Sequence, residues 1–405
     1  MKPKGFKELA QEFALYPQES LQKVKEGQSS LTIGLPKEIE SLENRIALTP
    51  GAVAILVNNG HSILVEANAG KPSKYADKDY SEAGAKICYS SKEVLQSDII
   101  LKVEPPTLNE ITDMKMGATL ISALQIAKQN NEYMEALAEK KITAIAYEFI
   151  EDKVGGRPVI RAMSEIAGST VMLIASEYLN SVNNGKGIIL GGITGVPPSK
   201  VVIIGAGTVA EYAARSAFGL GAEVKIFDNH IYKLRRLKRT LSSFIYTSTI
   251  DTETLSEALK EADVVIGALG TDENISPCVV TEQMVMKMPQ NSIIIDVSID
   301  QGGCFETSQI TNHKNPIYKK HDVLHYCVPN IPSRVARTAT TALSNIFTPI
   351  LLQIGKYGGV EDLMFTKEWF EKGVYAYKGC VTKQALARRF NMKFTDLSLI
   401  KPSRQ

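Results

Sequence analysis

The sequence predicts an α/β protein of two domains, each built on a mostly parallel sheet and connected by long helices. Three observations lead to this prediction. The chain has 405 residues, more than one compact core usually supports. Short apolar runs alternate with helical stretches from Leu31 onward, and a second series of such runs begins near Lys200. Alternation of this kind indicates parallel strands, because each connecting helix crosses back over the sheet.

The first series predicts the strands and helices of the first domain. Each strand run is brief, rich in Ile, Val and Leu, and bounded by turn residues. The predicted strands are 31–36, 62–67, 98–103, 118–124 and 142–150, and the helices between them include 49–60 and 129–141. The helical stretches end in glycine or lysine, as helices commonly do.

The second series predicts the strands 199–207, 222–229, 262–269, 292–299 and 323–330. Their near-continuous apolar composition is typical of strands covered on both faces. Two longer amphipathic stretches, 158–180 and 338–358, predict helices that connect the domains. We therefore expect a discontinuous first domain, 31–158 with 337–405, and a second domain at 159–336. Residues 1–30 are polar and predict a helical N-terminal extension.

Composition excludes several classes of protein. A formal charge of +2 argues against nucleic-acid and membrane-surface partners, which need concentrated basic patches. The five cysteines are scattered and form no ligand spacing, so we expect neither a metal site nor disulfides. We find no signal peptide and no continuous apolar run long enough to span a membrane. The sequence thus predicts a soluble, cytoplasmic protein.

A glycine-rich turn predicts a dinucleotide site in the second domain. Gly205, Gly207 and Ala210 occupy the G-x-G-x-x-A positions after an apolar strand and at the start of a helix. Gly205 permits the tight turn, Gly207 lets the backbone approach the pyrophosphate, and Ala210 lets the helix pack closely. Asp228 ends the next strand, where a carboxylate accepts from the ribose hydroxyls and favours NAD over NADP. The nearby Lys233, Arg235 and Arg236 would admit NADP, but we interpret them as solvated helix charges.

Two later turns also follow predicted strands. Asp300 and Gln301 precede two glycines, and Asn330 lies between two prolines. Ligands in open α/β sheets bind outside the carboxyl ends of the strands, so these residues are site candidates. Turn formation by the Asp and Asn side chains is the alternative interpretation.

The chain resembles the alanine dehydrogenase family, which is related to the NAD(H)-binding component of proton-translocating transhydrogenase. The resemblance runs from about Leu31 to about Gly359, in the order IGLPKEIESLENRIALTP, ILKVEPP, AYEFI, MSEIAG, LGGITGVPP, IGAGTVAEYAA, SIDQGGCFET and HYCVPNIPSRVARTATTALSN. It implies two Rossmann-like domains with an active-site cleft between them. It also implies a homo-oligomer, commonly a hexamer, and reversible NAD-dependent oxidative deamination of L-alanine to pyruvate and ammonia.

Site residues follow from the resemblance position by position. The arginine of the ENR block, Arg45, would bind the substrate carboxylate, a role that suits the guanidinium fork. Asp300 would lie by the reacting centre and the nicotinamide ribose. The family's cofactor contacts would fall on Ser164, Asp228, Lys233 and Asn330.

Two positions depart from the family pattern. Where the family has a catalytic lysine this chain has Glu104, and where the family has a catalytic histidine it has Gln125. Glutamine transfers no proton at neutral pH, and glutamate reverses the local charge. On a strand, Lys102 would point to the same face as Glu104 and either replace the lost ammonium or pair with Glu104. His325 begins a strand near the site and is a weaker candidate to replace the missing histidine.

These departures leave three hypotheses open. The first is an alanine dehydrogenase acting on a small amino acid or 2-oxo acid. The second is a dehydrogenase of another amino acid, such as a diamino acid, whose cationic or amide-bearing side chain would donate to Glu104 and Gln125. The third is an NAD(H)-binding sensor without catalysis.

Overall fold

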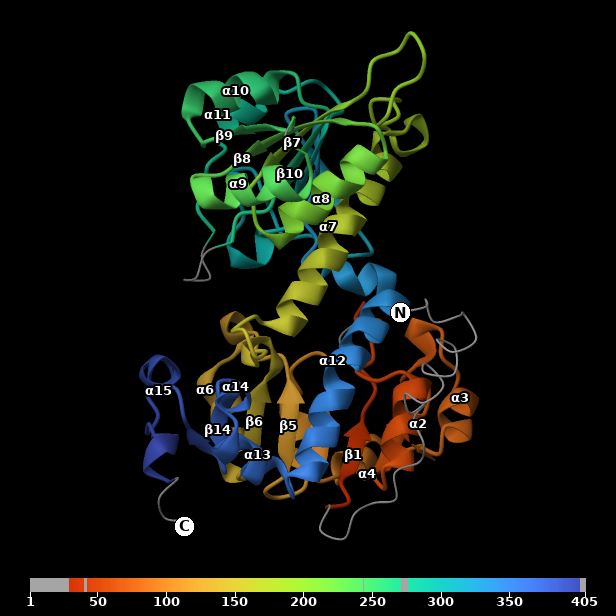
Figure 1. Ribbon diagram of the computed structural model, residues 1–405, viewed down its shortest axis with the longest axis vertical. Coiled ribbons are helices and arrows are strands. Elements are labelled where there is room, and N and C mark those ends of the chain that lie inside the picture. The colour runs from red at the N-terminus through yellow and green to blue at the C-terminus, as the bar shows by residue number, and fades with distance from the viewer. Residues whose placement is uncertain (1–28, 40–41, 243, 271–275, 401–405) are drawn as a thin grey trace, which may run out of the picture. The chain divides into compact units, whose positions relative to one another are not determined.

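The computed structural model describes residues 29–39, 42–242, 244–270 and 276–400 (Figure 1). The helical extension predicted for residues 1–30 lies outside them, apart from Ser29 and Ser30. The described residues form two compact units. Unit 1 combines residues up to Pro158 with those from Thr340 onward, and unit 2 comprises Val159–Ala339.

Unit 1 is built on an eight-stranded sheet in the order β15-β14-β6-β5-β4-β1-β2-β3. The six strands from β6 to β3 are parallel, whereas β14 and β15 form an antiparallel pair at the β6 edge. The strands are β1 (Thr32–Leu35), β2 (Ser62–Glu66), β3 (Lys86–Cys88), β4 (Ile99–Leu101), β5 (Thr119–Ser122), β6 (Thr143–Ala146), β14 (Val374–Tyr377) and β15 (Cys380–Val381).

Helices of unit 1 begin at clear sequence signals. Thr49 accepts from the Ala52 N–H and Pro50 opens α2, and Asn130 accepts from the Tyr133 N–H to begin α6. The helices are α2 (Pro50–Asn58), α3 (Asp77–Glu82), α4 (Ser91–Leu95), α5 (Leu108–Asp113), α6 (Asn131–Glu139), α12 (Ala336–Lys356), α13 (Val360–Thr366), α14 (Glu368–Glu371) and α15 (Gln384–Arg389). The C-terminal part of the chain thus completes unit 1: Thr340 of α12 accepts from the Ile46 N–H.

Unit 2 has a seven-stranded sheet in the order β12-β13-β11-β10-β7-β8-β9, parallel except for β12. Its strands are β7 (Lys200–Ile204), β8 (Glu223–Phe227), β9 (Tyr246–Ser248), β10 (Val264–Gly267), β11 (Ile293–Asp296), β12 (Ile317–Lys320) and β13 (Val323–Tyr326). Its helices are α7 (Pro158–Leu179), α8 (Thr208–Gly219), α9 (Ile231–Thr240), α10 (Thr252–Lys260) and α11 (Glu282–Val285). The prediction of an α/β protein with mostly parallel sheets is confirmed.

Each sheet reverses its strand order at one point. In unit 1 the reversal lies between β1 and β4, and in unit 2 it lies between β7 and β10. At such a point the loops after the two strands diverge and leave room at the carboxyl ends, where ligands of open α/β sheets bind. The two reversals are therefore candidate ligand sites.

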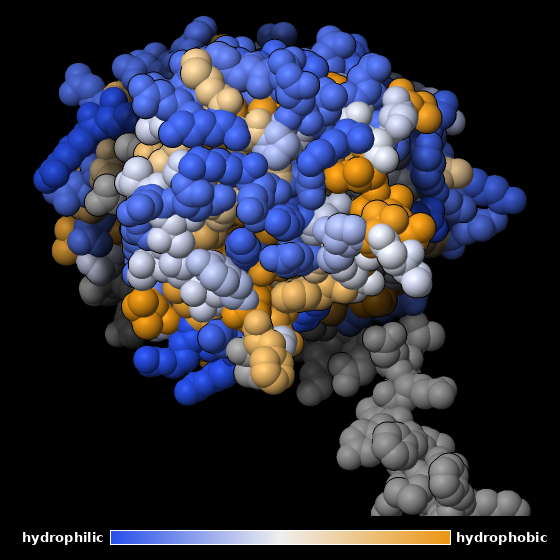
Figure 2. Space-filling model, turned by 90° about the horizontal axis from the view of Figure 1, so that it is seen from above, coloured by the Kyte–Doolittle hydropathy of each residue, from blue (hydrophilic) through white to orange (hydrophobic). Residues whose placement is uncertain are grey.

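Helix α7 is the one helix, within the described ranges, that is long and apolar enough to suit a membrane span. Its side chains Val171, Ile174 and Leu179 belong to the same buried apolar cluster of unit 2 as the strand residues Val201 and Ile203. About 44% of its most apolar stretch is buried within the protein. The buried side chains of α7 belong to the core of unit 2. On the face drawn in Figure 2, hydrophilic residues predominate and apolar residues form small separate patches.

Candidate active site and cofactor site

Charged residues gather where four strands of unit 1 end. Glu43 and Arg45 follow β1, Lys102 and Glu104 follow β4, Gln125 follows β5, and Glu148 follows β6. Glu43, Arg45, Lys102 and Glu104 are each no more than 7% exposed. Because these strands are parallel neighbours, their carboxyl ends meet at one edge of the sheet. The structure therefore brings Arg45, Glu104 and Gln125, all predicted from the sequence, into one cluster.

Arg45 is held by the neighbouring Glu43. Its Nε donates to Glu43 Oε1 over 2.8 Å and its Nη2 to Glu43 Oε2 over 2.6 Å. The Glu43 carboxylate also accepts from the Arg45 backbone N–H over 2.9 Å. Burial opposes the guanidinium charge, but Glu43 outweighs it and raises the pKa of Arg45. Arg45 is therefore a permanent, oriented cation in the cluster.

Glu104 lies between Arg45 and Gln125. Its Oε1 is 3.6 Å from Arg45 Nη2, and its Oε2 accepts from the Gln125 side-chain amide. Burial and the negative charge of Glu43 raise the pKa of Glu104 to about 7, although Arg45 acts in the opposite direction. A carboxyl group with this pKa exchanges a proton near neutral pH, which is the property that a general acid or base needs.

Lys102 contacts other carboxylates than predicted. Its Nζ donates to Glu110 Oε1 over 2.7 Å and lies 3.4 Å from Glu38 Oε2, and the side chain is 1% exposed. The suggested pairing with Glu104 is wrong, because β4 ends at Leu101 and strand alternation no longer applies. Lys102 instead connects the loop after β1 to α5 through these two carboxylates.

Glu148 and Tyr147 belong to the same region and were not among the predicted site residues. Glu148 Oε1 accepts from the Leu124 N–H over 2.7 Å and from the Gln125 N–H over 3.4 Å, which fixes the turn that carries Gln125. Gln125 itself adopts a left-handed conformation, with φ 44°. The Tyr147 hydroxyl donates to the Val103 carbonyl over 2.6 Å. Both residues were predicted to lie inside the strand 142–150, whereas β6 ends at Ala146, so their position at the carboxyl end of the strand was not visible in the sequence.

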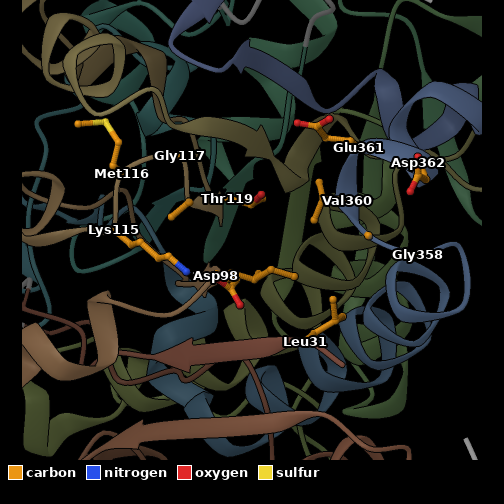
Figure 3. A pocket seen from close by; sticks show the side chains of 13 residues that line it. Leu31, Asp98, Lys115, Met116, Gly117, Thr119, Gly358, Val360, Glu361 and Asp362 are labelled. Carbon is orange, nitrogen blue, oxygen red and sulfur yellow. Dashed lines mark hydrogen bonds and ion pairs between the residues drawn. The ribbon is translucent and has the colours of Figure 1, made fainter. Parts of the chain in front are cut away.

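A separate hollow lies at the opposite edge of the unit 1 sheet (Figure 3). It measures about 700 Å³ and is lined by Leu31, Asp98, Lys115 and residues 358–362, among others. Leu31, Asp98 and Ala118 immediately precede β1, β4 and β5, so the hollow lies at their amino ends. Lys115 and Asp98 form an ion pair of 2.6 Å there. This hollow is distinct from the cluster around Glu104.

The glycine turn of unit 2 has the geometry that a dinucleotide requires. Gly205 has φ 117°, and a Cβ there would lie 2.3 Å from the Ala268 carbonyl oxygen at the end of β10. A Cβ on Gly207 would meet nothing within 4 Å, and no side chain caps α8, which begins at Thr208. Ala210 is fully buried beneath the helix. The turn thus offers open space and a helix N-terminus, which together fit a pyrophosphate.

Asp228 is engaged with this turn. Its Oδ2 accepts from the Ala206 N–H over 2.7 Å, and its Oδ1 accepts from the His230 N–H over 2.7 Å. The residue is 2% exposed. The carboxylate therefore positions the glycine turn, a role that the sequence did not predict, and contact with a ribose remains an expectation.

Substitution of Gly207 tests the cofactor site. We expect Gly207→Ala to fold normally, because φ is −78° and the methyl group meets no neighbour. The methyl group would enter the space left for the pyrophosphate, so we expect NADH to bind at least about 10-fold more weakly. Fluorescence titration with NADH measures this. Gly219→Ala, at the other end of α8 and equally open, is the control and should leave NADH affinity unchanged.

Asp300 and Gln301 lie in the turn after β11. The buried Asp296 shapes that turn by accepting from the Cys304 N–H over 2.9 Å and from the Ser308 hydroxyl over 2.6 Å. The Asp300 side chain is exposed, and Gln301 Oε1 is buried with no hydrogen-bond partner among the described residues. Both polar groups therefore remain candidates for ligand contact.

The remaining candidates of unit 2 are dispersed. Ser164 lies half-buried on α7, Lys233 half-buried on α9, and Asn330 in a left-handed turn with φ 63°. His325 is fully buried, with Nε2 2.8 Å from the Thr307 hydroxyl and Nδ1 3.0 Å from the Val323 carbonyl. Burial lowers the pKa of His325 to about 4. With both ring nitrogens engaged inside the core, His325 does not replace the missing histidine.

Comparison with known proteins agrees with this arrangement. The family models "Alanine dehydrogenase/PNT, N-terminal domain" and "Alanine dehydrogenase/PNT, C-terminal domain" match residues 34–167 and 171–384. Alanine dehydrogenase 2 of Staphylococcus aureus (strain Mu50) is 39% identical over 368 residues, which cover 91% of this chain and 98% of that protein.

Solved structures give the same result. An L-alanine dehydrogenase is 35% identical with a TM-score of 0.85, and the match covers 89% of this chain and 99% of that one. A transhydrogenase from Sinorhizobium meliloti shares the fold, with a TM-score of 0.75 at 23% identity over 87% of this chain and 99% of that one. The chain belongs to the alanine dehydrogenase/PNT family.

Proposed function

We propose that this protein is an NAD-dependent amino-acid dehydrogenase of the alanine dehydrogenase type, in which Glu104 is the proton-transfer group. L-alanine, converted reversibly to pyruvate and ammonia, is the substrate to test first, because the similar proteins are named for it. One observation carries the proposal: a buried carboxyl group with a pKa of about 7 lies beside Arg45 and Gln125 at the point where the unit 1 sheet reverses its order.

Each residue of the cluster then has a role. Arg45 faces the substrate carboxylate, and Glu43 keeps the guanidinium in its orientation. Gln125 donates to Glu104 and holds that carboxyl in place. In the deamination direction, ionised Glu104 takes a proton from the substrate ammonium and releases it to solvent. It then takes a proton from the water that attacks the imine and passes it to the departing amine. In the reverse direction, protonated Glu104 returns these protons.

The cofactor is NAD, which accepts a hydride from the substrate α-carbon when it is bound. The turn from Gly205 to Gly207 would hold the pyrophosphate, and Asp228 would hold the adenosine ribose while it supports that turn. Asp300, Gln301, Ser164, Lys233 and Asn330 would contact other parts of the cofactor. These roles use only open space and polar atoms that the described residues of unit 2 provide.

The pH dependence of turnover tests Glu104. Deamination of L-alanine needs the ionised form, so we expect kcat/KM to rise with pH through about 7. Reductive amination of pyruvate needs the protonated form, so its kcat/KM should fall as pH rises through the same value. Absorbance of NADH at 340 nm follows both directions. Absence of turnover with any amino acid at every pH, with NADH still bound, would contradict the proposal and favour a sensor.

We further propose a cytoplasmic assembly of identical chains. Exposed apolar side chains on the segment before β7, namely Ile189, Ile193 and Val196, support an interface there. A native mass of several chains in light scattering would bear out the assembly, and the mass of one chain would contradict it.

A further inference from the structure

Two acceptor oxygens in the cluster around Glu104 are buried without a donor. These are Gln125 Oε1 and Glu148 Oε2, and neither has a hydrogen-bond partner among the described residues. While Glu104 is ionised, the Gln125 side chain must present its NH₂ group to that carboxylate, so its oxygen faces away. A buried acceptor without a donor destabilises the fold. Both atoms therefore point to a donor that arrives with a ligand.

The three acceptors form one chain of contacts. Glu104 accepts from the Gln125 side chain, and Glu148 Oε1 lies 3.4 Å from the backbone nitrogen of the same Gln125. Gln125 thus connects the proposed base to Glu148, and the two unpartnered oxygens belong to two residues that are in contact. A substrate whose α-amino group is at Glu104 would extend its side chain along this line.

The charges of the surrounding side chains indicate which kind of hydrogen-bond donor suits this region. Lys102 is shared by Glu38 and Glu110, and Arg45 is shared by Glu43 and Glu104, so two cations face four carboxylates. Glu148 is a fifth carboxylate, and no ion pair within 4.0 Å holds it among the described residues. Arg157 lowers the pKa of Glu148 and Lys128 that of Glu104, so five carboxylates still exceed four cations. An excess of buried negative charge is stabilised by a cation more than by a neutral amide.

We propose that the preferred substrate is an L-α-amino acid with a second ammonium group on its side chain, held by Glu148 and the Gln125 carbonyl oxygen. This inference rests on the proposed dehydrogenase function. The α-carbon loses a hydride to NAD⁺, and water hydrolyses the imine. The products are a 2-oxo acid with its side-chain ammonium intact, NH₄⁺, NADH and one proton.

A pair of substrates of equal size tests this inference. L-2,4-diaminobutyrate and L-norvaline differ by an ammonium in place of a methyl group. We expect kcat/KM for the diamino acid, measured as NADH formation, to exceed that for L-norvaline at least about 10-fold, because the unpartnered acceptors reject a methyl group. L-ornithine against L-norleucine repeats the comparison with one more methylene group.

Glu148→Gln supplies the matched variant. The amide keeps an oxygen for the Leu124 and Gln125 N–H groups and replaces the second carboxylate oxygen, so the turn should persist. We expect the ratio of the two kcat/KM values to fall to near one. Glu135→Gln, an exposed residue of α6, is the control and should leave the ratio unchanged.

The outcomes separate the two proposals. Turnover of L-alanine with no preference for diamino acids would overturn this inference and leave the dehydrogenase function standing. A preference for L-asparagine over diamino acids would also overturn it, in favour of a neutral amide. No turnover of any amino acid, with NADH still bound, would overturn the proposed function and this inference with it.

Discussion

Glu104→Gln is expected to lower kcat on the order of 10²–10⁴-fold while NADH binding is unchanged. The substitution keeps the size of the side chain, and the new amide still meets Gln125 and Arg45 through its oxygen. It removes the one group of the cluster whose pKa, about 7, suits proton transfer at neutral pH. The rate of NADH formation at saturating substrate measures kcat, and titration of the same protein with NADH measures binding.

Two further variants make this prediction specific. Glu135→Gln removes an exposed glutamate from α6 and should leave kcat unchanged. The double variant Glu104→Lys with Gln125→His restores the residue pair that the family resemblance implies, and regained L-alanine turnover would mean that the remaining site is intact. Wild-type kcat in Glu104→Gln would show that another group transfers the proton. The change of kcat/KM with pH near 7 should disappear in Glu104→Gln, because the carboxyl group that produces it is absent.

Lys102→Met is expected to lower the free energy of unfolding of unit 1 by about 3–5 kcal/mol. Methionine keeps most of the aliphatic stem, so the main loss is the ammonium. Glu110, which lies 2.7 Å from that ammonium, and Glu38 are then left as buried carboxylates without their cation. Burial already raises the pKa of Glu38, and loss of Lys102 raises it further.

The sign of the pH dependence follows from that pKa. A carboxyl group whose folded-state pKa is raised stabilises the fold below its unfolded-state pKa, and this stability is lost as pH rises through the folded-state value. Lys102→Met should therefore be less destabilised in acid than at neutral pH. The chain has one tryptophan, Trp369 in α14, so its fluorescence during urea unfolding reports on unit 1.

Lys115→Met is the matched control for Lys102→Met. Lys115 forms an ion pair of 2.6 Å with Asp98, close to the Lys102–Glu110 distance, but both side chains are about half exposed. Water screens such a pair, so we expect a loss below about 1 kcal/mol. Equal losses for the two variants would contradict the view that Lys102 holds the loop after β1 to α5.

The sequence by itself predicted the elements whose pattern is local. The ten predicted strands each contain an observed strand, and the long stretches 158–180 and 338–358 correspond to α7 and α12. Short strands at or next to the sheet edges, such as β9, β12, β14 and β15, were missed. They have two to four residues and derive their hydrogen bonds from a neighbouring strand, so nothing in their own sequence distinguishes them from turns.

The glycine turn was likewise predictable, because its chemistry lies within one continuous motif. The positive φ of Gly205 and the open space beside Gly207 are what the G-x-G-x-x-A spacing requires. The hydrogen-bond partners of Asp228 were not predictable, because a carboxylate at the end of a strand can accept from a ribose hydroxyl or from backbone N–H groups. Only the folded turn shows that Ala206 and His230 donate to it.

The charged cluster shows most clearly what tertiary structure decided. Sequence and resemblance identified Arg45, Glu104 and Gln125 as residues that matter, but not their contacts or the pKa of Glu104. That pKa is a sum of burial and of charges on loops far apart in the chain, which only the parallel packing of β1, β4 and β5 brings together. The contacts of Lys102 with Glu38 and Glu110 were not predicted for the same reason. Pairing with Glu104 was only one of two alternatives for Lys102, and the choice among nearby carboxylates depends on distance in space, which the sequence does not give.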